Sequence, residues 1–333
     1  MFTKKTLVGP LKLTIDITDS CDMHCIMCWY HSFYLGNDKN LVPRFFPLKR
    51  FEALIKELKA MHTKTVTLCA EGEPLLHPQI KEIVELCQRH ALNIEIMTNA
   101  YYLDRENIVF FKKAGVKKIM VSLHSADSLT FEKIRPFKTK ESFERIIENL
   151  LFLKHIKGKN KEPRLFIINA ISSLNYQNVP DMAKLAEDLS ASKVLFKPVS
   201  LIPGLPGYLE LSKANKETLI NSLIKLSKEI NTANNIRSYL GVLHNNALAE
   251  GNLHRFKKKP PFSLCRCHIP WTSSVINIKG DVIGCVHSRG EILGNIFKSS
   301  FKDTWFGKKY NLFRKTYYCP KNCSGKVVYP LIP

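Results

Sequence analysis

The sequence predicts an α/β protein: a partial TIM-type barrel of six βα units, followed by a small C-terminal unit. Three observations support this fold class. Between residues 11 and about 232, short β-branched or apolar runs alternate with amphipathic stretches of helical length, which is typical of a parallel sheet covered by helices. The connection after the first predicted strand is unusually long. Five of the ten cysteines lie in the C-terminal quarter, around two short alternating runs.

Six strands and six helices follow from this pattern. The strands are expected at 11–18, 65–70, 93–100, 118–124, 164–172 and 193–199. The helices, several with apolar residues at i, i+3, i+4 and i+7, are expected at 48–62, 79–91, 104–114, 142–156, 179–190 and 215–231. Six such units close only part of a barrel, and in such folds the loops after the strands carry the chemistry.

The loops that follow the strands differ in content. The first, 19–47, contains three cysteines within eight residues, and the sixth, 200–215, is rich in glycine and proline. We expect the sixth loop to lie over the barrel mouth, with Tyr208 available to a substrate. The basic run 154–164 instead joins a helix to the next strand, which places it at the opposite end of the barrel.

Three segments are expected along the chain. Residues 1–235 form the barrel, 236–262 a linker that includes the charged, proline-containing stretch 254–261, and 263–333 the C-terminal unit. The charged residues and the two prolines of 254–261 are typical of a linker.

The net charge indicates what kind of molecule the protein binds. The chain has 333 residues and a formal charge of +21, which favours anionic partners. Nucleic acid is not expected among them, because the basic run 154–164 has no interleaved aromatic residue to stack on bases. The sequence contains no apolar run of about 18 residues and no recognisable secretory signal. We therefore expect a cytoplasmic protein without a membrane span.

The three clustered cysteines are Cys21, Cys25 and Cys28. Where thiols stay reduced, such cysteines are more often metal ligands than disulfide partners. Each iron of a 4Fe-4S cluster requires a soft ligand, so three cysteines on one loop hold three irons and leave the fourth open for a small chelating ligand. An incomplete structural zinc site and chance clustering are the alternatives. The isolated Cys69 and Cys87 are expected to be core residues.

This Cys-x3-Cys-x2-Cys loop after the first strand resembles the signature of the radical S-adenosylmethionine (SAM) superfamily. The resemblance implies a SAM-binding 4Fe-4S cluster, with Met27 and Trp29 near the adenine site. The segment Glu71, Gly72, Glu73, Pro74 resembles the Gly-Gly-Glu-Pro segment of the family, in which the acidic residue meets the SAM ammonium. One glycine of that pattern is Glu71 here.

Polar residues also end the next predicted strands, where family members contact the SAM carboxylate and ribose. The resemblance places Asn99 and Ser122 there, together with Asn169. His124 and Lys197 are candidate catalytic residues at the barrel mouth. Lys197 could bind a phosphate or carboxylate, or act as a base toward a substrate radical.

The C-terminal cysteines resemble the SPASM/twitch region of the same superfamily. This region consists of a β-hairpin, a Gly-Asn segment at 294–295, a short helix around Trp305 and a closing cysteine pair. The resemblance implies one auxiliary 4Fe-4S cluster held by four cysteines, with Cys265 as a competing ligand: Cys267, Cys285, Cys319 and Cys323. A structural zinc site with four cysteine ligands is the alternative.

The resemblance implies reductive cleavage of SAM to a 5′-deoxyadenosyl radical that removes hydrogen from a substrate. A fully ligated auxiliary cluster favours two-electron oxidation, with that cluster as electron acceptor. The expected partners are an anionic small-molecule or peptide substrate and an external electron donor such as flavodoxin or ferredoxin. Peptide maturation, C–C or C–S bond formation and group transfer remain alternatives, as does a non-enzymatic metal-cluster protein that binds nucleic acid.

Overall fold

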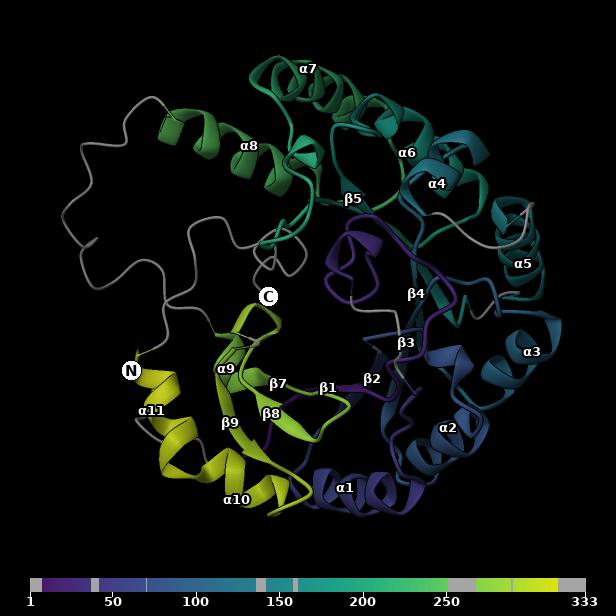
Figure 1. Cartoon of the computed structure of the whole chain (residues 1–333). Coiled ribbons are helices and arrows are strands. Elements are labelled where there is room, and N and C mark those ends of the chain that lie inside the picture. Colours follow the sequence, from purple (N-terminus) through teal and green to yellow (C-terminus); the bar gives the residue numbers. More distant parts are fainter. Residues whose placement is uncertain are drawn as a thin grey trace.

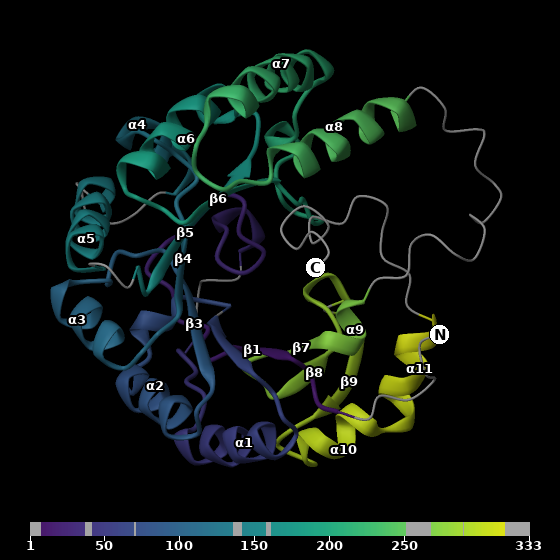
Figure 2. The ribbon, with the colours of Figure 1, turned by 180° about the vertical axis from the view of Figure 1, so that it is seen from behind.

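The computed structural model describes residues 8–36, 42–69, 71–135, 142–157, 161–250, 268–288 and 290–316. Within these ranges the strands form one nine-stranded sheet in the order β6-β5-β4-β3-β2-β1-β7-β8-β9. Figure 1 shows the sheet as a curved arc with helices on its outer side, and Figure 2 shows the same arrangement from behind. The predicted partial α/β barrel is confirmed.

All six predicted barrel strands form, each slightly shorter than expected. Neighbouring strands pair in parallel from β1 to β6. Their bounds are β1 (Lys12–Asp16), β2 (Thr65–Cys69), β3 (Asn93–Thr98), β4 (Lys118–Ser122), β5 (Arg164–Ile171) and β6 (Lys193–Pro198). All six carboxyl ends therefore meet at one edge of the sheet, which is also where the first cysteine loop begins.

The six predicted helices also form, as α1 (Leu48–Ala60), α2 (Ile80–Arg89), α3 (Arg105–Lys113), α5 (Ser142–Lys157), α6 (Val179–Asp188) and α7 (Lys213–Glu229). Short 3₁₀ turns occur in the loops after the strands and before some helices. They are η1 (Phe33–Leu35), η2 (Pro74–Leu76), η3 (Tyr176–Asn178) and η4 (Gly207–Leu209).

Before residue 251, two further helices were not predicted from the sequence. α4 (Ser128–Ile134) begins where the Asp127 side chain accepts a hydrogen bond from the Thr130 backbone N–H at 2.8 Å. α8 (Ile236–Glu250) lies in the stretch 236–262 that was expected to be a linker. Its first turn packs inward, with Tyr239 fully buried, so this part of the chain belongs to the packed structure.

The two faces of the barrel strands have different surroundings. Outward-facing Leu13, Val66, Ile94, Ile119 and Leu165 are buried in the main core under the helices. A separate apolar cluster on the inner face contains Met97, Met120, Ile168 and Leu195. The barrel therefore has an interior of its own, and this cluster forms an apolar layer within it.

Charged side chains occupy the amino-terminal end of this interior. The Glu95 carboxylate contacts the amines of Lys12 and Lys118 and accepts a hydrogen bond from Thr67 Oγ1 at 3.1 Å. Burial opposes ionisation of Glu95, but the two neighbouring amines outweigh it and lower its pKa. This ion cluster fills the end of the barrel opposite the cysteine loop.

The C-terminal unit continues the barrel sheet. It consists of α9 (Ile269–Thr272), β7 (Ser273–Ile276), β8 (Asp281–Ile283), η5 (Val286–Ser288), β9 (Ile292–Asn295), α10 (Phe301–Phe306) and α11 (Lys308–Thr316). β7 pairs in parallel with β1 and antiparallel with β8, and β8 pairs antiparallel with β9. The predicted hairpin turns at Gly280, where φ is 79°. None of the helices in the described ranges is both long and apolar enough to span a bilayer.

Candidate active site at the carboxyl edge of the barrel

The cysteine loop lies over the carboxyl edge of the sheet. Figure 1 shows this loop, in purple, near the centre of the ring of helices. Thr18 Oγ1 donates to the Arg44 carbonyl at 2.8 Å, and Ser32 Oγ donates to the Ile26 carbonyl at 2.9 Å. Between these anchors the Cys28 N–H donates to the Cys25 carbonyl at 2.9 Å. The loop is therefore a folded structure with fixed cysteine positions.

The surroundings of Cys28 suit a metal-bound thiolate. The backbone N–H groups of Tyr30 and His31 point at Cys28 Sγ, at 3.3 and 3.2 Å. Such donors stabilise a thiolate and tune an iron-sulfur cluster. Burial raises the pKa of the Cys28 and Cys21 thiols, with nearby Cys25 adding to the rise. The free thiols are thus neutral, and binding of a metal would replace their protons.

No group of three or more His, Cys, Asp or Glu side chains in the described ranges converges on one point as the ligands of a single ion would. An iron-sulfur cluster does not need that geometry, because each cysteine binds a different iron. The donor set and the N–H groups at Cys28 therefore fit a cluster of three cysteine ligands.

The segment after β2 is pressed against the cysteine loop. The Gly72 N–H donates to the Thr18 carbonyl at 3.2 Å, and the Glu73 N–H donates to the Ser20 carbonyl at 2.7 Å. A Cβ at Gly72 would lie 1.9 Å from the Ser20 carbonyl oxygen, so only glycine permits this approach. Pro74 then begins η2. Glu71 is buried close to the same loop.

Glu73 is buried and firmly held. Its carboxylate accepts hydrogen bonds from Thr98 Oγ1 at 2.6 Å, from the Asn99 backbone N–H at 2.7 Å and from the Leu75 backbone N–H at 3.1 Å. Burial is the largest cause that raises the pKa of Glu73 to about 7, and nearby Asp22 contributes in the same direction. A cation that reached this carboxylate would therefore find a preorganised partner.

Two charged residues near the cysteines were not singled out in the sequence. Asp22 accepts a hydrogen bond from Asn99 Nδ2 at 2.7 Å through Oδ1, while its Oδ2 is buried without a partner in the described ranges. Arg135, at the end of α4, is buried and contacts the Ser122 carbonyl through one terminal nitrogen. The position of Asp22 inside the cysteine motif was a signal that could have identified it. Arg135 had no such signal, because α4 was not predicted from the sequence.

His124 sits at the end of β4 in a left-handed backbone conformation, with φ 68°. Its Nδ1 accepts a hydrogen bond from the Ala170 N–H at 3.0 Å, so the ring proton is on Nε2. Burial lowers the pKa of His124, and Arg135 and Lys197 lower it further. In this arrangement the neutral ring can donate a hydrogen bond through Nε2 but cannot accept a proton there.

Asn169 lies directly beneath His124 and is fully buried. Its Oδ1 accepts a hydrogen bond from the His124 N–H at 2.9 Å, and its Nδ2 has no partner in the described ranges. Asn169 therefore joins β5 to the end of β4 and holds the strained backbone of His124.

Lys197 extends from β6 into the barrel interior near Cys69. Burial lowers the pKa of Lys197, and Cys69 partly opposes the change. The structure gives Lys197 no acidic partner among the described residues. Cys69 was expected in the core, but it is partly exposed, and its Sγ lies 3.8 Å from Met97 Sδ on the inner face.

The loop after β6 touches the cysteine loop at two points. Trp29 Nε1 donates to the Ser200 carbonyl at 2.9 Å, and the hydroxyls of Tyr34 and Tyr208 are hydrogen-bonded at 2.8 Å. Met27 packs in a small apolar cluster with Ala170 and Leu209. The loop predicted to lie over the mouth thus contacts the loop that bears the cysteines.

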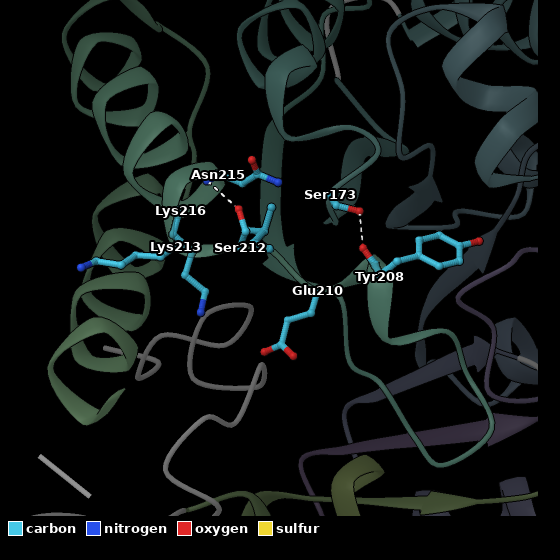
Figure 3. Close-up of a pocket in the computed structure, with 8 residues that line it drawn as sticks. Ser173, Tyr208, Glu210, Ser212, Lys213, Asn215 and Lys216 are labelled. Carbon is cyan, nitrogen blue, oxygen red and sulfur yellow. Dashed lines mark hydrogen bonds between the residues drawn. The ribbon is translucent and has the colours of Figure 1, made fainter. Parts of the chain in front are cut away.

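An open pocket of about 540 Å³ lies on the outer side of this loop, at the start of α7. Figure 3 shows the Ser173 hydroxyl bonded to the backbone of Tyr208, at 2.6 Å, beside the pocket. None of the described cysteines is among its lining residues. The lining residues are Ser173, Tyr208, Glu210, Leu211, Ser212, Lys213, Asn215 and Lys216.

Of the predicted auxiliary ligands, only Cys285 is described, whereas Cys265, Cys267, Cys319 and Cys323 lie outside the described residues. Cys285 is buried and follows β8. β8 runs antiparallel to β7, and β7 runs parallel to β1. Cys285 therefore lies toward the opposite end of the sheet from Cys21, Cys25 and Cys28.

Two family models match the chain. The model of the Radical SAM superfamily matches residues 15–186, and that of SPASM, an iron-sulfur cluster-binding domain, matches residues 265–325. Among curated proteins, the chain is 25% identical over 331 residues to the AdoMet-dependent heme synthase of Methanosarcina barkeri, covering 96% of this chain and 87% of that protein. It is 31% identical over 193 residues to GTP 3′,8-cyclase of Aquifex aeolicus, covering 56% of each chain.

Solved structures share the fold. Streptococcus suis SuiB bound to S-adenosylmethionine superimposes with a TM-score of 0.69 at 17% identity, over 96% of this chain and 73% of SuiB. SuiB bound to its precursor peptide SuiA gives a TM-score of 0.68. anSMEcpe with bound AdoMet gives 0.66 at 17% identity, over 96% of this chain and 84% of that one.

Proposed function

The chain belongs to the radical SAM superfamily and carries a SPASM domain, and from this premise we propose that it oxidises a carboxylate-bearing substrate by two electrons. Its cofactors are SAM, the SAM-binding 4Fe-4S cluster and an auxiliary iron-sulfur cluster in the SPASM domain. When bound, the first cluster supplies one electron that cleaves SAM, and the auxiliary cluster accepts the second electron from the substrate radical. The protein's own residues bind both reactants and exclude water.

Cys21, Cys25 and Cys28 would hold the first cluster, and Cys267, Cys285, Cys319 and Cys323 the auxiliary cluster. Glu73 would bind the ammonium of SAM, since its carboxylate is already positioned by three hydrogen bonds. The SAM carboxylate would then meet Arg135 and Ser122 at the end of β4. Met27 and its apolar neighbours would contact the adenine, with Trp29 anchoring the loop above.

The observation that carries the substrate proposal is the position of Lys197. Its amine enters the barrel interior on the carboxyl side of the apolar cluster around Leu195, and no described acidic residue pairs with it. An anionic group would favour the charged form of this desolvated amine and form a strong ion pair with it. The full-length similarity to a heme synthase agrees with this class, because heme carries carboxylates. His124 could donate a second hydrogen bond through Nε2.

Peptide maturation is the second candidate. Phe33, Tyr34 and Tyr208 are exposed at the mouth, by 52%, 42% and 54%, and exposed aromatic side chains are typical anchors for a polypeptide. A peptide with an acidic residue would also satisfy Lys197.

The proposed reaction is tested by measuring the oxidation state of the product and whether atoms of SAM are found in it. Carboxylated tetrapyrroles and acidic peptides are supplied to the reconstituted enzyme with SAM labelled with ¹³C in both its methyl group and its adenosyl moiety. We expect a substrate of this class to accelerate release of 5′-deoxyadenosine and to give a product oxidised by two electrons without ¹³C. Label in the product would identify group transfer and overturn the proposal of oxidation.

Replacement of Lys197 should separate substrate binding from SAM cleavage. Lys197→Met removes the charge but keeps most of the side-chain volume, and loss of a buried ion pair costs about 3 kcal/mol, or ~100-fold in kcat/KM. Substrate-independent release of 5′-deoxyadenosine should be unchanged. Lys193→Met, at the other end of β6, is the matched control. Equal kcat/KM in the wild type and Lys197→Met would remove Lys197 from the substrate site.

SAM affinity should depend on pH through Glu73. The raised pKa, about 7, means that this carboxyl is mostly protonated below pH 7 in the SAM-free enzyme. The SAM ammonium requires the ionised form, so affinity should fall about tenfold for each pH unit below 7 and level off above it. Calorimetric titration between pH 5.5 and 8.5 measures this dependence.

Glu73→Gln should bind SAM more weakly and without the pH dependence. Glu106→Gln, on the exposed surface of α3, is the matched control and should behave as the wild type. If Glu73→Gln keeps the full pH dependence, another group controls it.

A further inference from the structure

We infer that the outer face of α11, with the neighbouring surface of α10, is the docking site of a small acidic electron-transfer protein. This inference rests on the proposed function, because it assigns the place where the electron taken from the substrate leaves the enzyme. We call this surface the α11 face and define it by Lys302, Lys308, Lys309, Leu312 and Lys315.

The C-terminal stretch that includes α10 and α11 is strongly basic. Between residues 298 and 316 the sequence contains five lysines and one arginine but a single acidic residue, Asp303, and no acidic residue follows it up to residue 333. All four lysines of the α11 face are exposed. Clustered positive charge attracts an acidic partner and accelerates its association.

The α11 face also has an apolar centre. Lys308, Leu312 and Lys315 are separated by four and three positions, so they lie on one side of the helix. Leu312 is 60% exposed and is bordered by the lysines. A small apolar contact within a charged rim is the composition of weak, rapidly exchanging redox interfaces.

The inner side of the same helix packs on the auxiliary site. A Cβ at Gly284 would lie 2.0 Å from the Phe313 ring, so this glycine lets α11 approach the residue next to Cys285. The Tyr310 hydroxyl donates to the Ser273 carbonyl at 3.4 Å, and Tyr310 and Cys285 interact electrostatically. The exposed lysines and Cys285 therefore lie on opposite sides of the single helix α11.

The helix is held rigidly in that position. Arg314 is buried, donates to the carbonyls of Pro270 and Trp305, both at 2.9 Å, and stacks on the Trp305 and Tyr310 rings. Figure 1 shows α10 and α11 at the outer edge of the C-terminal unit, away from the loop over the barrel mouth. A carrier bound there would leave the mouth open to substrate.

The electron balance is simple. The oxidised carrier gains the one electron that the substrate radical gives up through the auxiliary site, and the proton released from the substrate goes to solvent. Nucleic acid fits this surface less well, because α10 and α11 expose no aromatic side chain on which a base could stack.

The test compares two charge-reversed triple variants of the holoenzyme. Lys308→Glu, Lys309→Glu, Lys315→Glu changes the α11 face. Lys184→Glu, Lys225→Glu, Lys228→Glu makes the same charge change on exposed lysines of α6 and α7. Binding of an oxidised acidic flavodoxin is measured by calorimetry at low and high salt. The rate of semiquinone formation is measured after photoreduced enzyme is mixed with the same flavodoxin.

We expect the α11 variant to lose at least about tenfold in affinity and in rate at low salt, and to lose most of the salt dependence, whereas the α6–α7 variant matches the wild type. Leu312→Asp should weaken binding in the same direction. Equal losses in both triple variants, or none in the α11 variant, would overturn the inference. So would loss of binding to a single-stranded RNA oligonucleotide with flavodoxin binding unchanged.

Failure of the proposed function appears separately. Dithionite-driven release of 5′-deoxyadenosine does not require the carrier and should be equal in the wild type and both triple variants. If the wild type releases none, the proposed chemistry fails, while the flavodoxin affinities still decide whether the α11 face is a docking site.

Discussion

Cys21→Ala, Cys25→Ala, Cys28→Ala should abolish release of 5′-deoxyadenosine and lower the iron content from about eight atoms per chain to about four. The three thiols are the only cysteines of the loop after β1, and without them no thiolate ligands remain there for iron. The auxiliary site should keep its iron, because Cys285 lies toward the opposite end of the sheet. Iron and sulfide analysis, with chromatography of the nucleoside product, measures both effects.

Cys87→Ala provides the matched control for this loss. Cys87 is fully buried on α2, among apolar residues of the main core. Its replacement should lower stability by about 1 kcal/mol without changing iron content or SAM cleavage. If the triple variant kept all its iron, the loop after β1 would not be the cluster site.

Gly72→Ala should disrupt the site with a single methyl group. The new Cβ would lie 1.9 Å from the Ser20 carbonyl oxygen and 2.4 Å from its carbon, so the segment after β2 must move away from the cysteine loop. Overpacking of this kind costs about 1–3 kcal/mol. Because Glu73 is the next residue, the shift should also weaken SAM binding by tenfold or more.

Gly207→Ala is the control, because a Cβ there meets open space. SAM affinity, iron content and thermal unfolding of the two variants should be measured together. A Gly72→Ala enzyme with wild-type SAM affinity would show that the close approach of the two loops is not needed for the site.

The barrel could be predicted from the sequence because each βα unit carries a local signal. The six strands are apolar runs of the right length, and α1, α2 and α6 have buried residues at helical spacing. α4 was missed because it is short, although Asp127 provides an N-cap. α8 was missed because its apolar residues show only weak helical periodicity, and its position depends on Asn235, whose side-chain amide bonds both backbone groups of Phe196.

The continuation of the sheet into the C-terminal unit had no local signal. β1 and β7 are about 260 residues apart in the chain, and parallel pairing at that separation depends on the whole fold. For the same reason the sequence could not place Cys285 relative to the first cysteine loop. Nor could it show that Arg135 lies near Asp22 and Cys28.

The site residues differ in how well the sequence defined their surroundings. Glu73 and Asn99 were placed near the SAM site from motif position, and the structure brings them into direct hydrogen-bond contact. His124 was proposed as catalytic, but its Nδ1 is occupied by a backbone N–H. That contact depends on the register of β5 beside β4, which a sequence pattern does not determine.

Metal and sulfide content of the anaerobically reconstituted wild type, measured beside 5′-deoxyadenosine release from SAM under dithionite, tests the central claim most directly. The account predicts about eight irons and about eight sulfides per chain, with release of 5′-deoxyadenosine that requires the reduced cluster. Stoichiometric zinc with no 5′-deoxyadenosine would contradict it and would leave a structural metal protein in place of a radical enzyme.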